Sequence, residues 1–415
     1  MLKALVSVLV LVSNIAVADQ SQPLVLMIGV DGLRADSLER ASAPNLQLLA
    51  ENGVRANMYP AMPSKTFVNF YSLATGLHPK NHGMVSNYFY DRKLGETFNR
   101  TKHTNDPAWW GGEPIWITAE KQGVTSATYF WVGSEVAVDS IKPSYWKPFN
   151  QSKDYGERVD EVLQWFALPN EKRPRLVTLY FSAVDSAAHT FGVGSLEELA
   201  AIKKVDDHIG DLIAGLIALG LYEDTNLVIV ADHGMANLSD DRVVNLDKWV
   251  DLSHFIIPDW SSTKNTVYAP YLNLYGDKVE VEKAFVKLTN KHPNMKVLRR
   301  GNFPKDYHFD HLDRGPDLML LADVGWTLYG SKNRLPPAPL KGSGRSIATH
   351  GYDNKHPLMQ ATFIASGKAF KAGVRVKPFD NIEVYNILSC ILDLVPANND
   401  GKLKHVEDML TKECD

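Results

Sequence analysis

The sequence PLVLMIGV, residues 23 to 30, is an apolar run without the polar alternation of a half-exposed strand. Such a run is typical of a strand covered on both faces, as in a parallel sheet. Three more runs have the same character: RLVTLYFSAV (175–184), TNLVIVA (225–231) and PLMQATFIA (357–365). We therefore expect these four segments to be buried strands.

Segments with helical spacing of apolar residues lie between these runs, such as SAPNLQLLAENG (42–53) and SLEELAAIKKVDDHIGDLIAGLIALG (195–220). Strands that alternate with helices predict an α/β fold with a large, mostly parallel, doubly wound sheet flanked by helices. Residues from about 245 to 340 break the rhythm with a helix-like segment, a strand-like segment and the proline-rich RLPPAPLKG. We interpret them as a cap region inserted into one domain of residues 19–415.

The first twenty residues, MLKALVSVLVLVSNIAVADQ, place a lysine ahead of an apolar run that ends in small residues. This layout predicts a signal peptide, residues 1–18, cleaved after Ala18, because the run is short for a bilayer. A retained membrane anchor is the alternative. No later stretch of the sequence is apolar enough to span a membrane, so we expect an exported protein, periplasmic or secreted.

The composition is that of an ordinary globular protein, with 45% hydrophobic and 22% charged residues. A net charge of -4 over 415 residues provides no basic face, so polymeric nucleic acid is not an expected partner. Small phosphate substrates remain compatible with this net charge, because they need only a local site. The two cysteines, Cys390 and Cys414, are either a disulfide or two free thiols, and they are too few for a metal site of their own.

Three of the four apolar runs end in an aspartate. Asp31 follows the first run, Asp185 the second and Asp232 the third. In open α/β sheets the ligand crevice lies at the carboxyl ends of the strands, so these carboxylates are expected to converge at one edge.

Histidines accompany these aspartates. His189 lies four residues after Asp185, on the same face if that segment is helical, and His233 adjoins Asp232, while His350 lies in ATHGYDN. Carboxylate oxygens and imidazole nitrogens suit zinc, and six such residues are enough for two ions. Taken singly, each aspartate is as well explained as a helix cap and each histidine as a bystander. The joint placement favours a metal site.

Two adjacent cations activate an attacking oxygen and neutralise a leaving one in an in-line displacement at phosphorus. That chemistry needs a nucleophile. In MPSKTFVNFYSLATG (62–76), Thr66 stands where a helix is expected to begin. It is either an N-cap or the nucleophile, and the metal pattern favours the second role.

Six segments in order resemble the nucleotide pyrophosphatase/phosphodiesterase family of the alkaline phosphatase superfamily. They are DGLR (31–34), SKTFVNFYSLATGLHPKNHGM (64–84), SNYFYD (86–91), VDSAAHTFG (184–192), ADHGM (231–235) and THGYDN (349–354). The resemblance implies a zinc held by Asp185, His189 and His350, and a second zinc held by Asp31, Thr66, Asp232 and His233. It also implies that Thr66 attacks the substrate and forms a covalent phospho-threonine, which water hydrolyses to release a nucleoside 5′-monophosphate.

The resemblance further implies substrate-binding roles. Asn87 would donate to a phosphate oxygen, and this neutral donor favours singly charged diesters over monoesters. Phe67, Phe149 and Tyr180 would sandwich a nucleobase, although buried aromatics are equally common in a core. Trp131 would form a further wall of this pocket.

Other functions stay open at this point. A choline- or lipid-type phosphodiesterase of the same family differs only in its loops and cap. A phosphomonoesterase would share the metals, whereas a sulfatase would need a modified cysteine or serine motif that the sequence lacks. A zinc-stabilised binding protein without catalysis would be expected to lack a ligand or the nucleophile, and none is missing.

Overall fold

The computed structural model describes residues 22–258 and 266–414. The predicted signal peptide, residues 1–18, lies outside these described residues. Within them, no helix has the length and apolar character that crossing a membrane requires.

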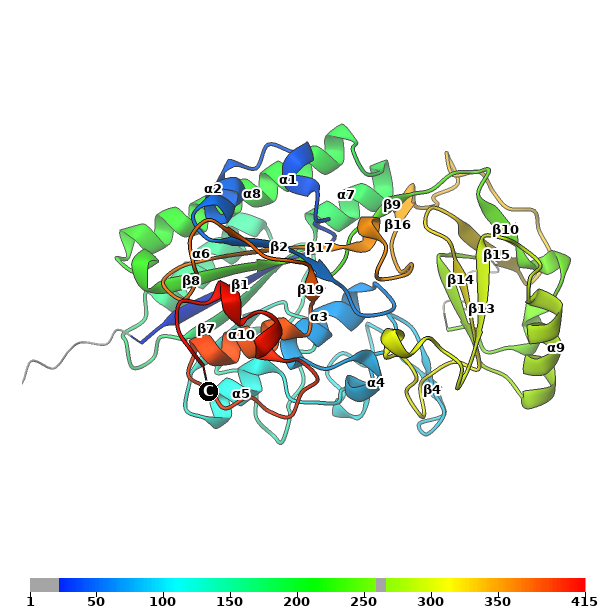
Figure 1. Ribbon diagram of the computed structural model, residues 1–415, viewed down its shortest axis with the longest axis horizontal. Coiled ribbons are helices and arrows are strands. Elements are labelled where there is room, and N and C mark those ends of the chain that lie inside the picture. Colours follow the sequence, from blue (N-terminus) through cyan, green and yellow to red (C-terminus); the bar gives the residue numbers. More distant parts are fainter. Residues whose placement is uncertain (1–21, 259–265, 415) are drawn as a thin grey trace, which may run out of the picture.

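The main domain is built on a nine-stranded sheet with the order β18-β2-β17-β8-β1-β7-β5-β6, and β19 pairs with β2 (Figure 1). Every strand pair in it is parallel except those made by β17. The α/β class and the large, mostly parallel sheet that the sequence predicts are thus confirmed. The strands are β1 (Leu24–Val30), β2 (Val54–Tyr59), β5 (Ser126–Tyr129), β6 (Tyr145–Lys147), β7 (Leu176–Phe181), β8 (Thr225–Val230), β17 (Ala361–Ser366), β18 (Val374–Arg375) and β19 (Phe379–Asp380).

Two of the four expected strands differ from the prediction: β7 ends at Phe181, because Ala183 and Val184 already belong to α7, and the fourth segment differs more. Pro357–Met359 form a 3-10 turn, and β17 begins only at Ala361 and runs antiparallel to β2 and β8. The cause is its entry point, because the chain returns through β16 (Ala348–Thr349), which pairs with β9 (Ala236–Asn237) just beyond the end of β8. A strand that enters at the edge where parallel strands end must run the opposite way.

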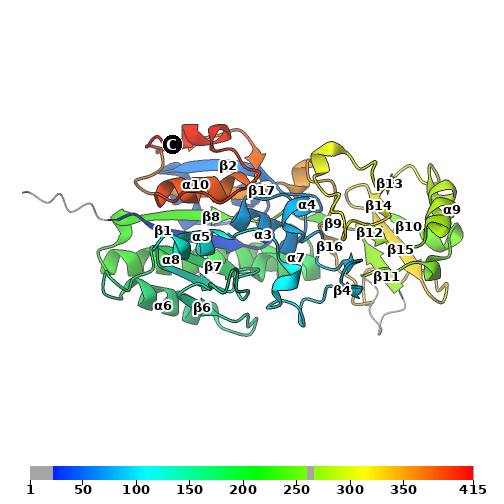
Figure 2. The same ribbon diagram turned by 90° about the horizontal axis from the view of Figure 1, so that it is seen from below.

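Helices cover both faces of this sheet (Figures 1 and 2). One face carries α2 (Pro44–Glu51), α6 (Tyr155–Phe166), α7 (Ala183–Phe191) and α8 (Leu196–Ala218), and α1 (Ser37–Arg40) lies nearby. The other carries α3 (Thr66–Thr75), α5 (Ile115–Lys121) and α10 (Glu383–Ile391), with α4 (Pro79–His82) beyond α3.

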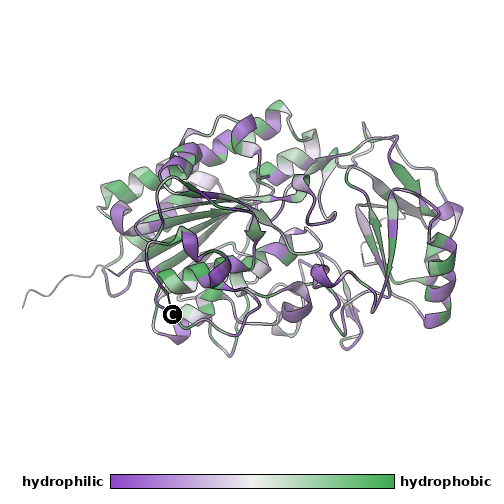
Figure 3. Cartoon of the chain, viewed as in Figure 1, coloured by the Kyte–Doolittle hydropathy of each residue, from purple (hydrophilic) through white to green (hydrophobic). Residues whose placement is uncertain are grey.

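The core lies between these layers, where the apolar strands appear green in Figure 3. All seven residues of β1 are buried, as expected for a central strand. Gly29 is required there because a Cβ at this position would lie 2.7 Å from the Phe70 ring and 2.9 Å from the Trp131 ring. The absent side chain lets both rings pack directly on β1.

Within residues 243–331, the described residues 243–258 and 266–331 form a separate lobe with its own apolar core, on the right of Figure 1. It contains two three-stranded sheets and α9 (Lys278–Leu288). The cap region expected at about residues 245–340 overlaps this lobe. One sheet of the lobe has the order β10 (Val243–Asn245), β15 (Thr327–Ser331), β11 (Thr266–Ala269). The other has the order β12 (Tyr271–Leu274), β14 (Leu318–Ala322), β13 (Met295–Arg299). Outside the lobe, β3 (Tyr90–Asp91) pairs with β4 (Glu96–Thr97).

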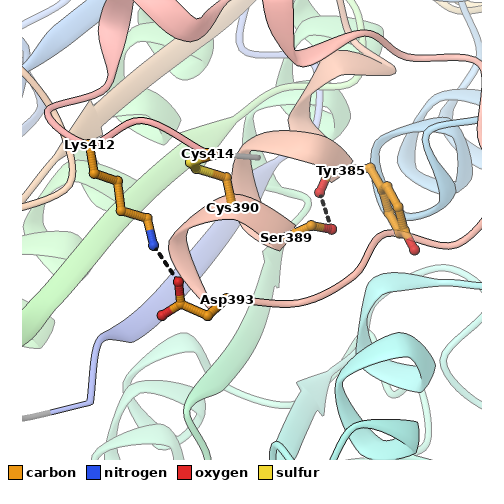
Figure 4. Close-up of a disulfide and its surroundings, with 6 residues drawn as sticks. All are labelled: Tyr385, Ser389, Cys390, Asp393, Lys412 and Cys414. Carbon is orange, nitrogen blue, oxygen red and sulfur yellow. Dashed lines mark hydrogen bonds and ion pairs between the residues drawn. A yellow bond between two sulfur atoms is a disulfide. The ribbon is translucent and has the colours of Figure 1, made fainter.

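A disulfide joins Cys390, on α10, to Cys414 (Figure 4). Of the two alternatives for the cysteines, the structure therefore has the disulfide. Beside it, the Lys412 ammonium lies 2.8 Å from the Asp393 carboxylate. The two contacts fasten residues 412–414 to α10 and to the turn that follows it.

Candidate active site

The predicted ligands meet at the edge where the parallel strands end. Asp31 follows β1, Asp185 opens α7 after β7, and Asp232 follows β8. Gly32 allows the close approach, since it has a φ of +72° and a Cβ there would lie 3.0 Å from the backbone of Asp185. Its N–H donates to the Asp232 carboxylate at 3.1 Å, which ties two of the strand ends together.

The six aspartates and histidines form two groups, in each of which the ligand atoms lie within 4.8 Å of one another. In the first, Nε2 of His189 lies 3.3 Å and Nε2 of His350 lies 3.5 Å from Oδ1 of Asp185. The i,i+4 spacing on α7 that the sequence suggested is present. His350 arrives from the segment after β16, far along the chain.

The second group adjoins the first, because the rings of His233 and His350 stack with centres 3.5 Å apart. Nε2 of His233 lies 2.8 Å from Oδ2 of Asp232 and 3.5 Å from Oδ1 of Asp31. The Thr66 hydroxyl lies 3.4 Å from the same Nε2. All seven residues predicted as metal ligands are therefore gathered at one place.

Backbone carbonyls set the protonation of the three histidines. A carbonyl oxygen only accepts, so each bonded Nδ1 carries the proton and each Nε2 keeps a lone pair directed into the site. This is the arrangement of metal-binding histidines. The contacts are His189 to Ala348 at 2.7 Å, His233 to Gly234 at 2.9 Å and His350 to Ser64 at 2.8 Å.

The carboxylates also fit a cation. Among the described residues, Oδ1 of Asp31, Oδ1 of Asp185 and Oδ2 of Asp232 are buried without a hydrogen-bond partner. Burial and repulsion from its neighbours raise the pKa of Asp31, and burial raises the pKa of Asp232. Divalent cations would neutralise this buried charge and fill the unpaired oxygen positions.

Thr66 is the first residue of α3, and Lys65 is the N-cap. The Thr66 side chain is therefore not a helix cap, which answers the question that its sequence context leaves open. The N–H of Phe67 donates to Oδ1 of Asn87 at 3.0 Å, which turns the Asn87 amide group toward the start of the helix. The N-terminus of a helix favours an anion at this position.

The predicted aromatic residues occupy different environments. Phe67 is half-buried, and Phe149 is 51% exposed, so both rings offer surface to a ligand. Tyr180 is only 8% exposed and donates its hydroxyl to Oδ2 of Asp31 at 2.6 Å. Trp131 is buried, with its indole N–H on the Phe70 carbonyl at 3.0 Å. Tyr180 and Trp131 are thus both buried, contrary to their predicted place in a base pocket: Tyr180 supports Asp31, whereas Trp131 packs against Phe70.

Sequence reasoning missed the groups that orient the ligands. The carbonyls of Ser64 and Ala348 leave no trace in the residue type, because every residue carries one. The Tyr180 hydroxyl was missed as the partner of Asp31 because that contact depends on β1 and β7 being neighbours, with Gly29 opposite Tyr180.

The sequence model of the type I phosphodiesterase / nucleotide pyrophosphatase family matches residues 25–353. The chain belongs to this family. Among its curated members, the chain is 38% identical over 395 residues to a pyrophosphatase/phosphodiesterase of Schizosaccharomyces pombe, covering 92% of this chain and 79% of that one. It is 37% identical over 408 residues to ectonucleotide pyrophosphatase/phosphodiesterase family member 1 of Mus musculus, covering 95% of this chain and 43% of that one. The chain is also 37% identical to the venom phosphodiesterase CdcPDE of Crotalus durissus collilineatus, and the match covers 92% of this chain and 46% of that one.

Solved structures of the family have the same fold. Murine ectonucleotide pyrophosphatase/phosphodiesterase 5 superposes with a TM-score of 0.84 at 29% identity and covers 94% of this chain and 100% of its own. An inactive threonine-to-alanine variant of that protein, in complex with AMP, gives a TM-score of 0.85. The chain spans less than half the length of the mouse and rattlesnake family members.

Proposed function

We propose that this protein is an exported, two-zinc nucleotide pyrophosphatase/phosphodiesterase. The observation that carries the proposal is the Thr66 hydroxyl at the start of α3, 3.4 Å from Nε2 of His233 and next to the residue whose N–H holds Asn87. A nucleophile, an anion-binding helix terminus and two ligand groups then surround one point. Curated relatives named as pyrophosphatases and phosphodiesterases, and a solved relative in complex with AMP, support nucleotides as the substrate class.

The seven predicted ligands would hold the two ions, with His189, His350 and Asp185 on one and Asp31, Asp232, His233 and Thr66 on the other. Bound zinc lowers the pKa of a coordinated hydroxyl or water and neutralises negative charge on a phosphate and its leaving oxygen. The mixed carboxylate and imidazole donors suit zinc.

The reaction proceeds in two steps, through a covalent bond between phosphorus and the Thr66 oxygen. The Thr66 hydroxyl gives up its proton to solvent and the oxygen attacks phosphorus in line with the leaving group, which departs with the electrons of its P–O bond as the nucleoside phosphoryl group becomes esterified to Thr66. Water then attacks the same phosphorus, the bond to Thr66 breaks, and the threonine oxygen regains a proton. Nucleoside 5′-monophosphate is released.

The Nδ2 amino group of Asn87 and the N–H groups in the first turn of α3 other than that of Phe67, which donates to Asn87, bind the non-bridging phosphate oxygens. Both are neutral donors, which match the single charge of a diester better than the nearly double charge of a monoester. The half-buried Phe67 and the exposed Phe149 provide ring surface on which a base can stack. The lobe of residues 243–331 serves as the cap of the site in this proposal.

The deciding experiment compares hydrolysis of the nitrophenyl ester of thymidine 5′-monophosphate with that of nitrophenyl phosphate by the zinc-loaded protein. We expect a ratio far above one that a chelator abolishes. A ratio below one would identify a phosphomonoesterase. Activity only on choline or lipid diesters would replace nucleotides by those diesters as the substrate class.

Thr66→Ala separates catalysis from metal binding. We expect loss of turnover with most of the zinc retained, because six ligands remain, as measured by metal analysis of the purified variant. The control is Thr411→Ala, which removes an exposed hydroxyl that bonds to the Lys368 carbonyl. Undiminished turnover by the Thr66 variant would contradict the mechanism.

A further inference from the structure

Arg100 lies in a well-bonded turn after β4. Oδ1 of Asn99 accepts hydrogen bonds from the N–H and hydroxyl of Thr101, at 2.8 and 2.7 Å, and from the N–H of Lys102 at 3.2 Å. The N–H of Asn99 in turn donates to Nδ1 of His103 at 3.1 Å. The backbone on both sides of Arg100 is therefore held in place.

The guanidinium group of Arg100 contacts two residues that flank the phosphate-binding groups. Its Nε and Nη2 donate to the Tyr88 hydroxyl at 3.1 and 2.6 Å, and its central carbon lies 4.8 Å from the centre of the Tyr88 ring. The same carbon lies 5.8 Å from the centre of the Phe67 ring. Tyr88 follows Asn87 in sequence and Phe67 follows Thr66, so Arg100 borders the site from both segments.

These contacts place the charge at the Phe67 ring, on which the base stacks in the proposed function. The Phe67 ring extends from Thr66 toward Phe98 and Trp110, whose ring centres lie 6.0 and 6.2 Å away. The Arg100 guanidinium lies over this ring, and in the described part of the chain it makes no contact with the six aspartates and histidines of the two ligand groups. It is thus unsuited to bind the leaving group at the metals.

The guanidinium group also keeps donors available. Nη1 of Arg100 has no hydrogen-bond partner among the residues that the structure describes, and the residue is exposed. Arginine pairs best with two neighbouring acceptors. Guanine presents such a pair in O6 and N7, whereas adenine presents N7 beside an amino group that is itself a donor.

We propose that Arg100 is a specificity-determining residue that reads the edge of a base stacked on Phe67 and favours guanine over adenine. The inference rests on the proposed nucleotide phosphodiesterase function. Both purines stack equally on a ring, so the comparison between them isolates the hydrogen bonds made by Arg100.

The test measures kcat/KM for the nitrophenyl esters of guanosine and adenosine 5′-monophosphate. The guanosine ester is expected to be favoured about tenfold by the unaltered protein, the size of one bidentate arginine contact. Arg100→Leu should bring the ratio of guanosine to adenosine kcat/KM close to one. Arg100→Gln, which retains a donor, should give a ratio between that of Arg100→Leu and that of the unaltered protein. Lys102→Leu is the matched control, since this exposed lysine of the same turn pairs with Glu96 and should leave the ratio unchanged.

Product binding gives a second readout without turnover. Calorimetric titration of the zinc-loaded Thr66→Ala variant with GMP and AMP should show the same preference, and adding Arg100→Leu should remove it. A ratio near one in the unaltered protein, or a ratio that Arg100→Leu does not change, would overturn the proposal. Failure to hydrolyse any ester would instead refute the proposed function, and the GMP and AMP titrations would then decide the role of Arg100 on their own.

Discussion

Asp31 accepts a hydrogen bond from a residue outside the proposed set of metal ligands. The Tyr180 hydroxyl donates to its Oδ2 at 2.6 Å, which leaves Oδ1 directed at His233. Tyr180→Phe should lower zinc affinity about tenfold to a hundredfold, because loss of such a supporting partner frees the ligand to rotate. Competition with a chromophoric chelator measures the change. Tyr145→Phe is the control, since that hydroxyl bonds to the Lys172 carbonyl on an exposed part of the surface; equal affinity in both variants would contradict the assignment.

The residues with the clearest chemistry were predictable. Asp31, Asp185 and Asp232 follow apolar runs, and His189 is one helical turn from Asp185, so strand-end convergence and helical spacing were enough to bring them together. The surroundings of Tyr180 and Arg100 were not predictable. Both depend on which side chains pack beside them, and no local pattern in the sequence records that.

The short helix α4 meets the lobe through two stacked histidines. The rings of His78, which precedes α4, and His308, in the lobe, have centres 3.8 Å apart with a tilt of 13°. Burial, followed by repulsion from His308, lowers the pKa of His78 to about 4 from 6.5. Asp400 and Asp380 favour the charged forms of the two rings, while Lys80 opposes them.

This pair predicts how stability depends on pH. Because the pKa of His78 is lower in the folded than in the unfolded state, its contribution is fully present above about pH 6.5 and is lost as the pH falls toward 4. Because the ring is partly exposed, this loss should lower the free energy of unfolding by roughly 1 to 3 kcal/mol. Urea denaturation at several pH values tests this, and His78→Gln should flatten the dependence over that interval. Parallel curves for the two proteins would refute the prediction.

At the scale of elements, the apolar runs identified four strands but not all of their directions. β17 carries the same kind of sequence as β1, and nothing in its residues distinguishes a parallel from an antiparallel strand. Its direction follows from the lobe, which returns the chain at the edge where β8 ends. Topology of this kind becomes visible only when the whole path is known.

Across the whole molecule, the disulfide fastens the C-terminal residues at the edge opposite the site. Residues around it line a cavity together with Pro23, Arg175 and Asn226, which lie where β1, β7 and β8 begin. Cys390 and Cys414 are separated by 24 positions, so the crosslink should stabilise the fold by about 3 kcal/mol through loop closure.

The double variant Cys390→Ser, Cys414→Ser measures that contribution without leaving a free thiol. We expect the free energy of unfolding to fall by about 3 kcal/mol in guanidinium titrations. Diester hydrolysis by the folded fraction should be unchanged, because the strands begin at this edge and the metal groups lie where they end. A stability equal to that of the unaltered protein would show that the C-terminal residues are held by other contacts.

The path of the chain also sets the order in which the protein can mature. Asp31 is among the first described residues, but His350 is supplied only after the chain has left the sheet and returned from the lobe of residues 243–331. An emerging or truncated chain therefore has an incomplete pair of ligand groups. In the proposed function, the ion of the first group, held by Asp185, His189 and His350, would bind only after the chain has returned from the lobe, so full zinc loading would report completed assembly.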